Sequence, residues 1–104
     1  EGMASVVLTK EVLERFQATD QLAYLVVSVP GTVEGILAWS MYVEQEDETF
    51  RVHLRSKAPT VNDIAQEFGG GGHTLACGIP SVTKSQILEV DAKLKEAVRN
   101  FKKN

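Results

Sequence analysis

The stretch from residue 50 to residue 78 reads FRVHLRSKAPTVNDIAQEFGGGGHTLACG and contains most of the information about the fold. Apolar and polar residues alternate over residues 50–56, which predicts a half-buried β-strand. An Ala-Pro pair breaks that strand, and residues 60–68 then carry apolar side chains at helical spacing. The helix ends at four consecutive glycines. Strand, helix and glycine run together predict an α+β unit.

The helix over residues 60–68 has a start signal in the sequence. Thr60 can act as its N-cap, and Asp63 three residues later completes a capping box. We therefore expect the helix to begin at Thr60. Its buried stripe is predicted to be Val61, Ile64, Ala65 and Phe68.

A second strand precedes the first in the chain. Residues 35–45 alternate, but both faces are apolar, which is typical of a central strand. The charged residues 46–48 make a turn, so that residues 35–45 and 50–56 form a β-hairpin. Trp39 and Tyr42 are predicted to be core residues.

The outer segments are read in the same way. Residues 9–17 predict a first helix, and residues 83–101 a closing helix with a Thr83–Gln86 capping box. Residues 78–82 are expected to form an edge strand or to be irregular, because they contain Pro80. Residues 21–29 fit a helix or a strand, and propensity does not decide between them. The buried side of the closing helix is predicted to be Ile87, Val90, Leu94, Val98 and Phe101.

The predicted fold class is α+β, with a small mixed β-sheet (a central hairpin plus an edge strand) packed by helices. The 104 residues fit a single domain, and 43% of them are hydrophobic. The single cysteine, Cys77, cannot form an internal disulfide and is expected to be a small buried residue in a cytoplasmic protein. The net charge of −3 argues against a protein that coats long nucleic acids. No apolar run reaches the roughly 20 residues that span a membrane.

The glycine run is the main functional signal. Each glycine loses extra conformational entropy on folding, so four in a row suggest that the backbone must approach something closely. Successive amides of residues 69–72 could form a concave nest for an anion. Residues 74–77 could add a short helical turn whose N-terminus faces the same anion. The alternative is a flexible linker or a plain turn.

A cationic row is the second signal. Arg51, His53, Arg55 and Lys57 alternate and should share one face of their strand, where they could hold phosphate. The alternative is an ordinary solvated face. His73 could donate a hydrogen bond to phosphate or stack on a base, although a lone histidine is more often structural. A zinc site is not expected, because no Cys-x-x-Cys pair is present. The carboxylates are scattered, so no catalytic residue is predicted.

Four segments in a fixed order carry a family resemblance: VHLRSK at 52–57, VNDIA at 61–65, FGGGGH at 68–73 and ACG at 76–78. The chain resembles the C-terminal DHH-associated domain of DHH phosphoesterases, and is most similar to the bacterial nano-RNase branch. Those enzymes degrade very short oligoribonucleotides and dephosphorylate 3′-phosphoadenosine 5′-phosphate. The resemblance implies that residues 1–104 form a substrate-binding domain that is not an enzyme by itself. It also implies that a separate N-terminal catalytic domain, absent from this chain, carries the Asp-His-His motif and manganese.

The resemblance assigns substrate contacts residue by residue. The implied partners are a short oligonucleotide or phosphorylated nucleotide and the catalytic domain of the same parent protein, with no cofactor in this chain. Related modules leave three alternatives open: a RecJ-type single-strand binder, an alanyl-tRNA synthetase-type tRNA binder and a cyclic-dinucleotide phosphodiesterase module. Cys77 is a departure, since relatives more often have Ala or Ser there. The implied substrate-binding residues are Arg55, Ser56, Gly69, Gly70, Gly71, Gly72, His73, Ala76 and Gly78, with His53 and Lys57 as further candidates.

Overall fold

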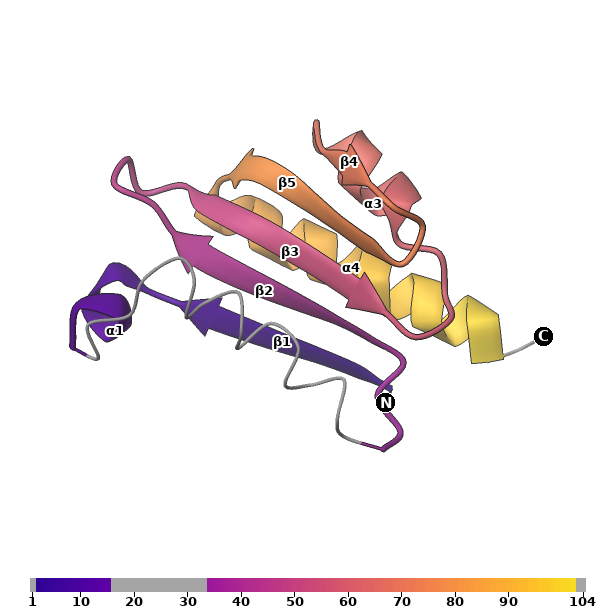
Figure 1. Cartoon of the computed structure of the whole chain (residues 1–104). Helices are drawn as coiled ribbons and strands as arrows, with labels where there is room; N and C mark the ends of the chain where they lie inside the picture. The colour runs from indigo at the N-terminus through magenta and orange to yellow at the C-terminus, as the bar shows by residue number, and fades with distance from the viewer. Residues whose placement is uncertain (1, 16–33, 103–104) are drawn as a thin grey trace.

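The computed structural model describes residues 2–15 and 34–102. They form a mixed five-stranded sheet in the order β1-β2-β3-β5-β4, with α4 lying across one face (Figure 1). This confirms the predicted α+β class, while residues 21–29 lie outside the described residues. The strands are β1 (Met3–Leu8), β2 (Ala38–Glu44), β3 (Phe50–Ser56), β4 (Gly71–Gly72) and β5 (Ala76–Val82), and the helices are α1 (Lys10–Arg15), α3 (Asn62–Glu67) and α4 (Lys84–Lys102).

The predicted hairpin is confirmed as β2 and β3. The two strands pair antiparallel from Ala38 opposite Ser56 to Glu44 opposite Phe50. The side chains on both faces of β2 are buried, and β1 and β3 pair with its two edges, as is typical of a central strand. In the turn, Asp47 accepts hydrogen bonds from the hydroxyl and the amide of Thr49, and these bonds lower the pKa of the Asp47 carboxyl.

The strand β1 was missed by the sequence analysis. It pairs in parallel with β2, with Met3 opposite Ala38 and Leu8 opposite Val43. A parallel pair joins segments that are far apart in the chain, so no local turn signal announces it. β1 therefore makes the sheet mixed and protects one side of β2.

The expectation that residues 78–82 form an edge strand is confirmed for residues 79–82, which pair with β3 alone, whereas Gly78 also pairs with β4. β5 lies between β3 and β4, and the outer strand β4 consists of Gly71 and Gly72. Pro80 is tolerated because the β3–β5 register shifts between Phe50 and Val52, which leaves a bulge at the proline. The predicted helical turn over residues 74–77 was wrong, since β5 already begins at Ala76.

The predicted Thr60 cap of the middle helix was wrong as well. α3 begins at Asn62 after Val61, which makes no side-chain cap. Val61 is fully buried and its amide donates to the Thr74 carbonyl at 3.0 Å, so core packing, not a cap, sets where the helix begins.

The C-terminus of α3 follows a Schellman pattern. The Gly70 amide donates to the Ala65 carbonyl at 2.8 Å, and the Gly69 amide donates to the Gln66 carbonyl at 3.2 Å. Gly69 has a φ of 87°, which favours glycine at this position. The helix thus ends at the glycine run, as predicted.

The capping box of α4 is confirmed, because the Thr83 amide donates to the Gln86 Oε1 at 2.8 Å and the Gln86 amide to the Thr83 hydroxyl at 3.3 Å. The prediction for Phe101 was wrong: it is 42% exposed. Figure 1 shows the C-terminal end of α4 extending past the end of β3, so the sheet does not cover this turn. The buried side chains of α4 are Val90, Leu94 and Val98.

A polar cluster fixes α4 to the sheet. Asp91 Oδ1 accepts hydrogen bonds from the Ser40 hydroxyl at 2.7 Å and the Tyr42 hydroxyl at 2.6 Å, and Asp91 Oδ2 accepts one from Ser5 at 2.9 Å. Burial, and then the Asp91 carboxylate, raise the pKa of Tyr42. Tyr42 is a core residue, as predicted, whereas Asp91 was not singled out. The cluster joins β1, β2 and α4 in one network of hydrogen bonds.

Candidate functional site

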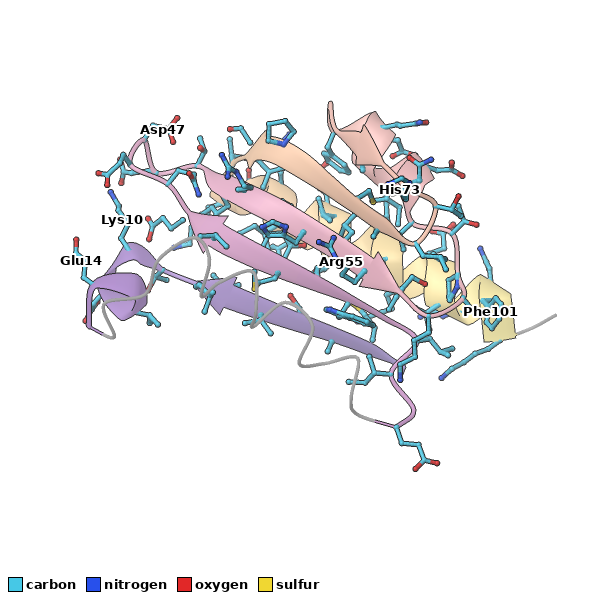
Figure 2. The ribbon with its side chains drawn as sticks, viewed as in Figure 1. Lys10, Glu14, Asp47, Arg55, His73 and Phe101 are labelled. Atoms are coloured by element: carbon cyan, nitrogen blue, oxygen red, sulfur yellow. The ribbon has the colours of Figure 1, made fainter. Side chains whose placement is uncertain are left out.

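The two faces of β3 differ: one is buried in the core and the other carries cationic side chains. Phe50, Val52 and Leu54 are buried in the core with the side chains of α3 and α4. The residues between them point to the opposite face, and Figure 2 shows Arg55 on the side of the sheet turned away from α4. The predicted common face of the cationic row is therefore confirmed for Arg51, His53 and Arg55. Lys57 follows the end of β3 and is exposed.

The cationic face of β3 borders small residues of the next strands. His53 lies opposite Gly78, and Arg55 lies opposite Ala76. Gly78 in turn lies opposite Gly71 of β4. Residues directly opposite one another project from the same face, so small residues leave open space beside the two cationic side chains.

A groove of about 540 Å³ occupies this space. Its volume lies within the range of small-molecule sites. Its floor includes glycine backbone, and its walls carry both apolar and cationic side chains. The lining residues are Arg51, Val52, His53, Gly69, Gly70, Gly71, Gly78, Ile79 and Pro80.

The glycines differ in what the fold demands of them. A Cβ on Gly70 would lie 2.0 Å from the Gly78 carbonyl oxygen, and one on Gly72, whose φ is 144°, would lie 2.8 Å from the Cys77 Cα. Both glycines are thus required for the close approach to β5. A Cβ on Gly71 would meet nothing within 4 Å. Gly71 is therefore the glycine of this loop that folding does not require, and it lines the groove.

The expected amide nest is not formed by all four glycines. The amides of Gly69 and Gly70 donate to carbonyls at the end of α3, as described above, and Gly71 and Gly72 form a strand. Backbone amides used inside the fold are not available to an anion. The glycine run instead provides a floor without side chains.

Arg55 is not among the residues that line the groove, and two carbonyls hold its guanidinium in place. Its Nη1 donates to the Leu54 carbonyl at 2.9 Å and to the Cys77 carbonyl at 3.2 Å. These bonds keep the guanidinium over the boundary between the paired strands β3 and β5. Cys77 itself is buried, as predicted, and burial raises the pKa of its thiol while Arg55 opposes that effect.

Ser56 and His73 lie away from the groove lining. Ser56 is opposite Ala38, whose side chain belongs to the helix-covered core, and its hydroxyl donates to the Leu37 carbonyl at 3.3 Å. His73 is exposed in the turn between β4 and β5, where it exchanges backbone hydrogen bonds with Ala76 at 2.9 and 3.3 Å. These bonds place His73 beside Ala76, which lies opposite Arg55; Figure 2 labels both His73 and Arg55. Substrate contact by either residue stays a prediction.

The domain family follows from comparison with known proteins. The DHHA1 domain family matches residues 5–100. The chain belongs to the DHHA1 domain family. This confirms the resemblance drawn from the Arg-Ser-Lys, glycine-run and Ala-x-Gly segments.

Two relatives of this chain are much longer than the chain itself. The chain is 35% identical over 98 residues to a probable bifunctional oligoribonuclease and PAP phosphatase, NrnA, of Streptococcus mutans, covering 94% of this chain and 32% of that protein. It is 44% identical over 77 residues to the Bacillus subtilis bifunctional oligoribonuclease and PAP phosphatase NrnA, covering 74% and 24%. The chain thus spans a third or less of the length of these relatives.

A solved structure supports the same fold. An exopolyphosphatase-related protein from Bacteroides fragilis matches 94% of this chain and 29% of its own, with a TM-score of 0.72 and 26% sequence identity.

The described part of this DHHA1 domain shows neither a metal cluster nor a membrane helix. Within residues 2–15 and 34–102, no three His, Cys, Asp or Glu side chains come together as a metal site would require. No helix in those ranges is long and apolar enough to cross a membrane. The groove of the described residues brings Arg51 and His53 together with glycine backbone.

Proposed function

We propose that this DHHA1 domain binds the phosphate groups of a nucleotide or very short oligoribonucleotide on behalf of a DHH phosphoesterase. In this proposal a separate catalytic domain of the same parent protein, working in the cytoplasm, cleaves the phosphate ester. Any manganese would belong to that domain, because the residues described here do not fit a metal site.

The observation that carries the proposal is the joint position of the cationic row and the glycine floor. Arg51 and His53 project from β3 into the groove that Gly71 and Gly78 line, and Arg55 projects from the same face of β3, opposite Ala76 and outside the groove lining. Guanidinium groups donate two parallel hydrogen bonds to phosphate, and a floor without side chains lets a ligand approach the backbone. The whole chain has a net charge of −3, so the positive charge is local to this face.

The named activities of the relatives agree with this chemistry. Two relatives that the chain matches over most of its own length are named oligoribonucleases and PAP phosphatases. Both kinds of substrate carry phosphates on a nucleoside, which is the chemistry that the groove favours.

Isothermal titration calorimetry with 5′-phosphorylated diadenylate tests the proposal. Arg55→Gln should weaken binding about tenfold, because one charge-assisted contact is lost. Arg99→Gln is the matched control, since Arg99 is an exposed arginine in the last turn of α4. If Arg55→Gln and Arg99→Gln bind like the unmodified chain, the proposed function is wrong.

Ligand length separates the proposal from a general single-strand binder. A module for long chains should bind a 20-nucleotide RNA much more tightly than the dinucleotide, because each extra phosphate contact adds affinity. We expect no such preference.

A further inference from the structure

We propose that Arg51 forms a second phosphate contact in the groove, so that the domain holds two neighbouring nucleotides of its ligand. This inference rests on the proposed function and assigns a residue that the family resemblance did not. The sequence analysis placed Arg51 in the cationic row, but only the structure places it in the lining of the groove.

Arg51 is an exposed side chain that lines the groove together with the glycine floor. Among the described residues, no carboxylate forms an ion pair with Arg51. An arginine without a carboxylate partner at the wall of a groove is available to bind an external anion.

Arg51 and Arg55 are too far apart in the strand to act as one clamp. Four residues of a strand span about 13 Å, and His53 projects from the same face between them. The Arg55 guanidinium is also held over the boundary between β3 and β5 by two carbonyls. The two arginines therefore suit phosphates of different nucleotides.

The groove offers room for a base beside Arg51. Gly69, Gly70 and Gly71 contribute no side chains, and the exposed Pro80 gives an apolar wall, whereas the side chain of Ile79 belongs to the buried core. A flat aromatic ring can lie against such a surface without covering polar side chains that would lose their contact with water.

The surface beyond Arg51 becomes acidic. A shallow pocket lined by Glu46, Asp47 and Pro80 shares its proline with the groove. The pKa of Asp47 is lowered by its bonds to Thr49, so this carboxyl is ionised at neutral pH. Like charges in proximity repel, so a further phosphate past Arg51 would be disfavoured. The proposed ligand thus has one phosphate position in the groove at Arg51, a second at Arg55 outside the groove lining, and a negative boundary beyond Arg51.

The test compares two ligands on three forms of the chain. Adenosine 5′-monophosphate carries one phosphate, and 5′-phosphorylated diadenylate carries two. Affinities are measured by isothermal titration calorimetry for the unmodified chain, Arg51→Gln and Arg55→Gln, with Arg99→Gln as control. Circular dichroism verifies that each variant is folded.

We expect Arg51→Gln to weaken diadenylate binding about tenfold and to change monophosphate binding less than about twofold. Arg55→Gln should weaken both. For the diadenylate, the slope of log affinity against log salt should decrease by roughly 0.7 in Arg51→Gln, as expected for one lost phosphate contact.

Two results would overturn the inference, and they are distinguishable. If Arg51→Gln binds diadenylate with unchanged affinity and salt slope while Arg55→Gln is weakened, Arg51 is no phosphate contact and the proposed function survives. If the unmodified chain binds neither ligand, or Arg55→Gln has no effect on either, the proposed function fails and this inference with it.

Discussion

Replacing one glycine of the loop should remove binding without affecting folding. Gly71→Ala places a methyl group where the structure has nothing within 4 Å, at a position whose φ is not in the left-handed region. The same change at the adjacent Gly70 puts a Cβ 2.0 Å from the Gly78 carbonyl oxygen. The pair of variants therefore separates the role of a glycine in the ligand site from its role in the fold.

The magnitudes follow from these contacts. Gly71→Ala should change the free energy of unfolding by between zero and about +1 kcal/mol, because alanine restricts the unfolded chain and meets no obstacle. Gly70→Ala must push β4 away from β5, and an overpacking of this kind costs about 3 kcal/mol. For a domain of this size that cost corresponds to a decrease in Tm of roughly 12 to 24 °C.

Thermal unfolding followed by circular dichroism measures the stability of both variants, and calorimetry with 5′-phosphorylated diadenylate measures binding. Gly71→Ala should keep its Tm and lose at least about tenfold in affinity, because the methyl group occupies the floor of the groove. Full affinity in a folded Gly71→Ala variant would show that the ligand does not approach this floor. A large loss of stability in Gly71→Ala would refute the assignment of open space around it.

Three further predictions concern stability. Leu94→Ala should lower the free energy of unfolding by 2 to 5 kcal/mol in urea, since Leu94 is fully buried between α4 and the sheet; a cost under about 1 kcal/mol would contradict this packing. Because the pKa of Tyr42 is raised, its contribution to stability is complete below the usual 10.0 and is lost as pH rises beyond that value. The free energy of unfolding should therefore decrease less steeply at alkaline pH in Tyr42→Phe than in the unmodified chain. Equal pH profiles would contradict the burial of the Tyr42 hydroxyl and its bond to Asp91. The lowered pKa of Asp47 has the opposite sign: its contribution to stability is present above the usual 3.8 and is lost as pH falls below that value. In urea titrations Asp47→Asn should therefore lose less stability on acidification than the unmodified chain, and equal losses would contradict the bonds from Thr49 to Asp47.

The sequence predicted the elements that local patterns define. The β2–β3 hairpin follows from alternation and a charged turn, and the start of α4 follows from the Thr83–Gln86 capping box, whose two hydrogen bonds the structure contains. Both patterns lie within a few residues of the structure they specify.

Elements that depend on distant pairing could not be predicted. β1 gains its strand partner from β2, more than 30 residues away in the chain. β4 consists of Gly71 and Gly72, which have low strand propensity and become a strand only because β5 pairs with them. For this reason the sequence analysis missed β4, which pairs with Cys77 and Gly78 and leaves residues 79–82 at the edge, as predicted.

The candidate site was predicted in its residue types but not in its layout. Alternation places Arg51, His53 and Arg55 on one face from the sequence alone. That Gly78 lies beside His53 depends on the β3–β5 register, and the position of Arg51 depends on the bulge between Phe50 and Val52. Because neither register nor bulge can be derived from one sequence, Arg51 could not be separated from an ordinary solvated arginine.

The register between β3 and β5 connects the fold with the site. A slip of one residue exchanges the two faces of a strand, which would bury Arg55 in the core and turn Leu54 toward the groove. Leu54 is fully buried opposite Cys77, which is itself buried, so such a slip would expose a large apolar side chain and bury a charge. The bulge lies beyond this segment, between Phe50 and Val52, so it does not disturb the pairs at Val52 to Arg55. The packing of the helix-covered face therefore determines where the cationic row meets the glycine floor, and core residues that never contact a ligand should control its affinity through this register.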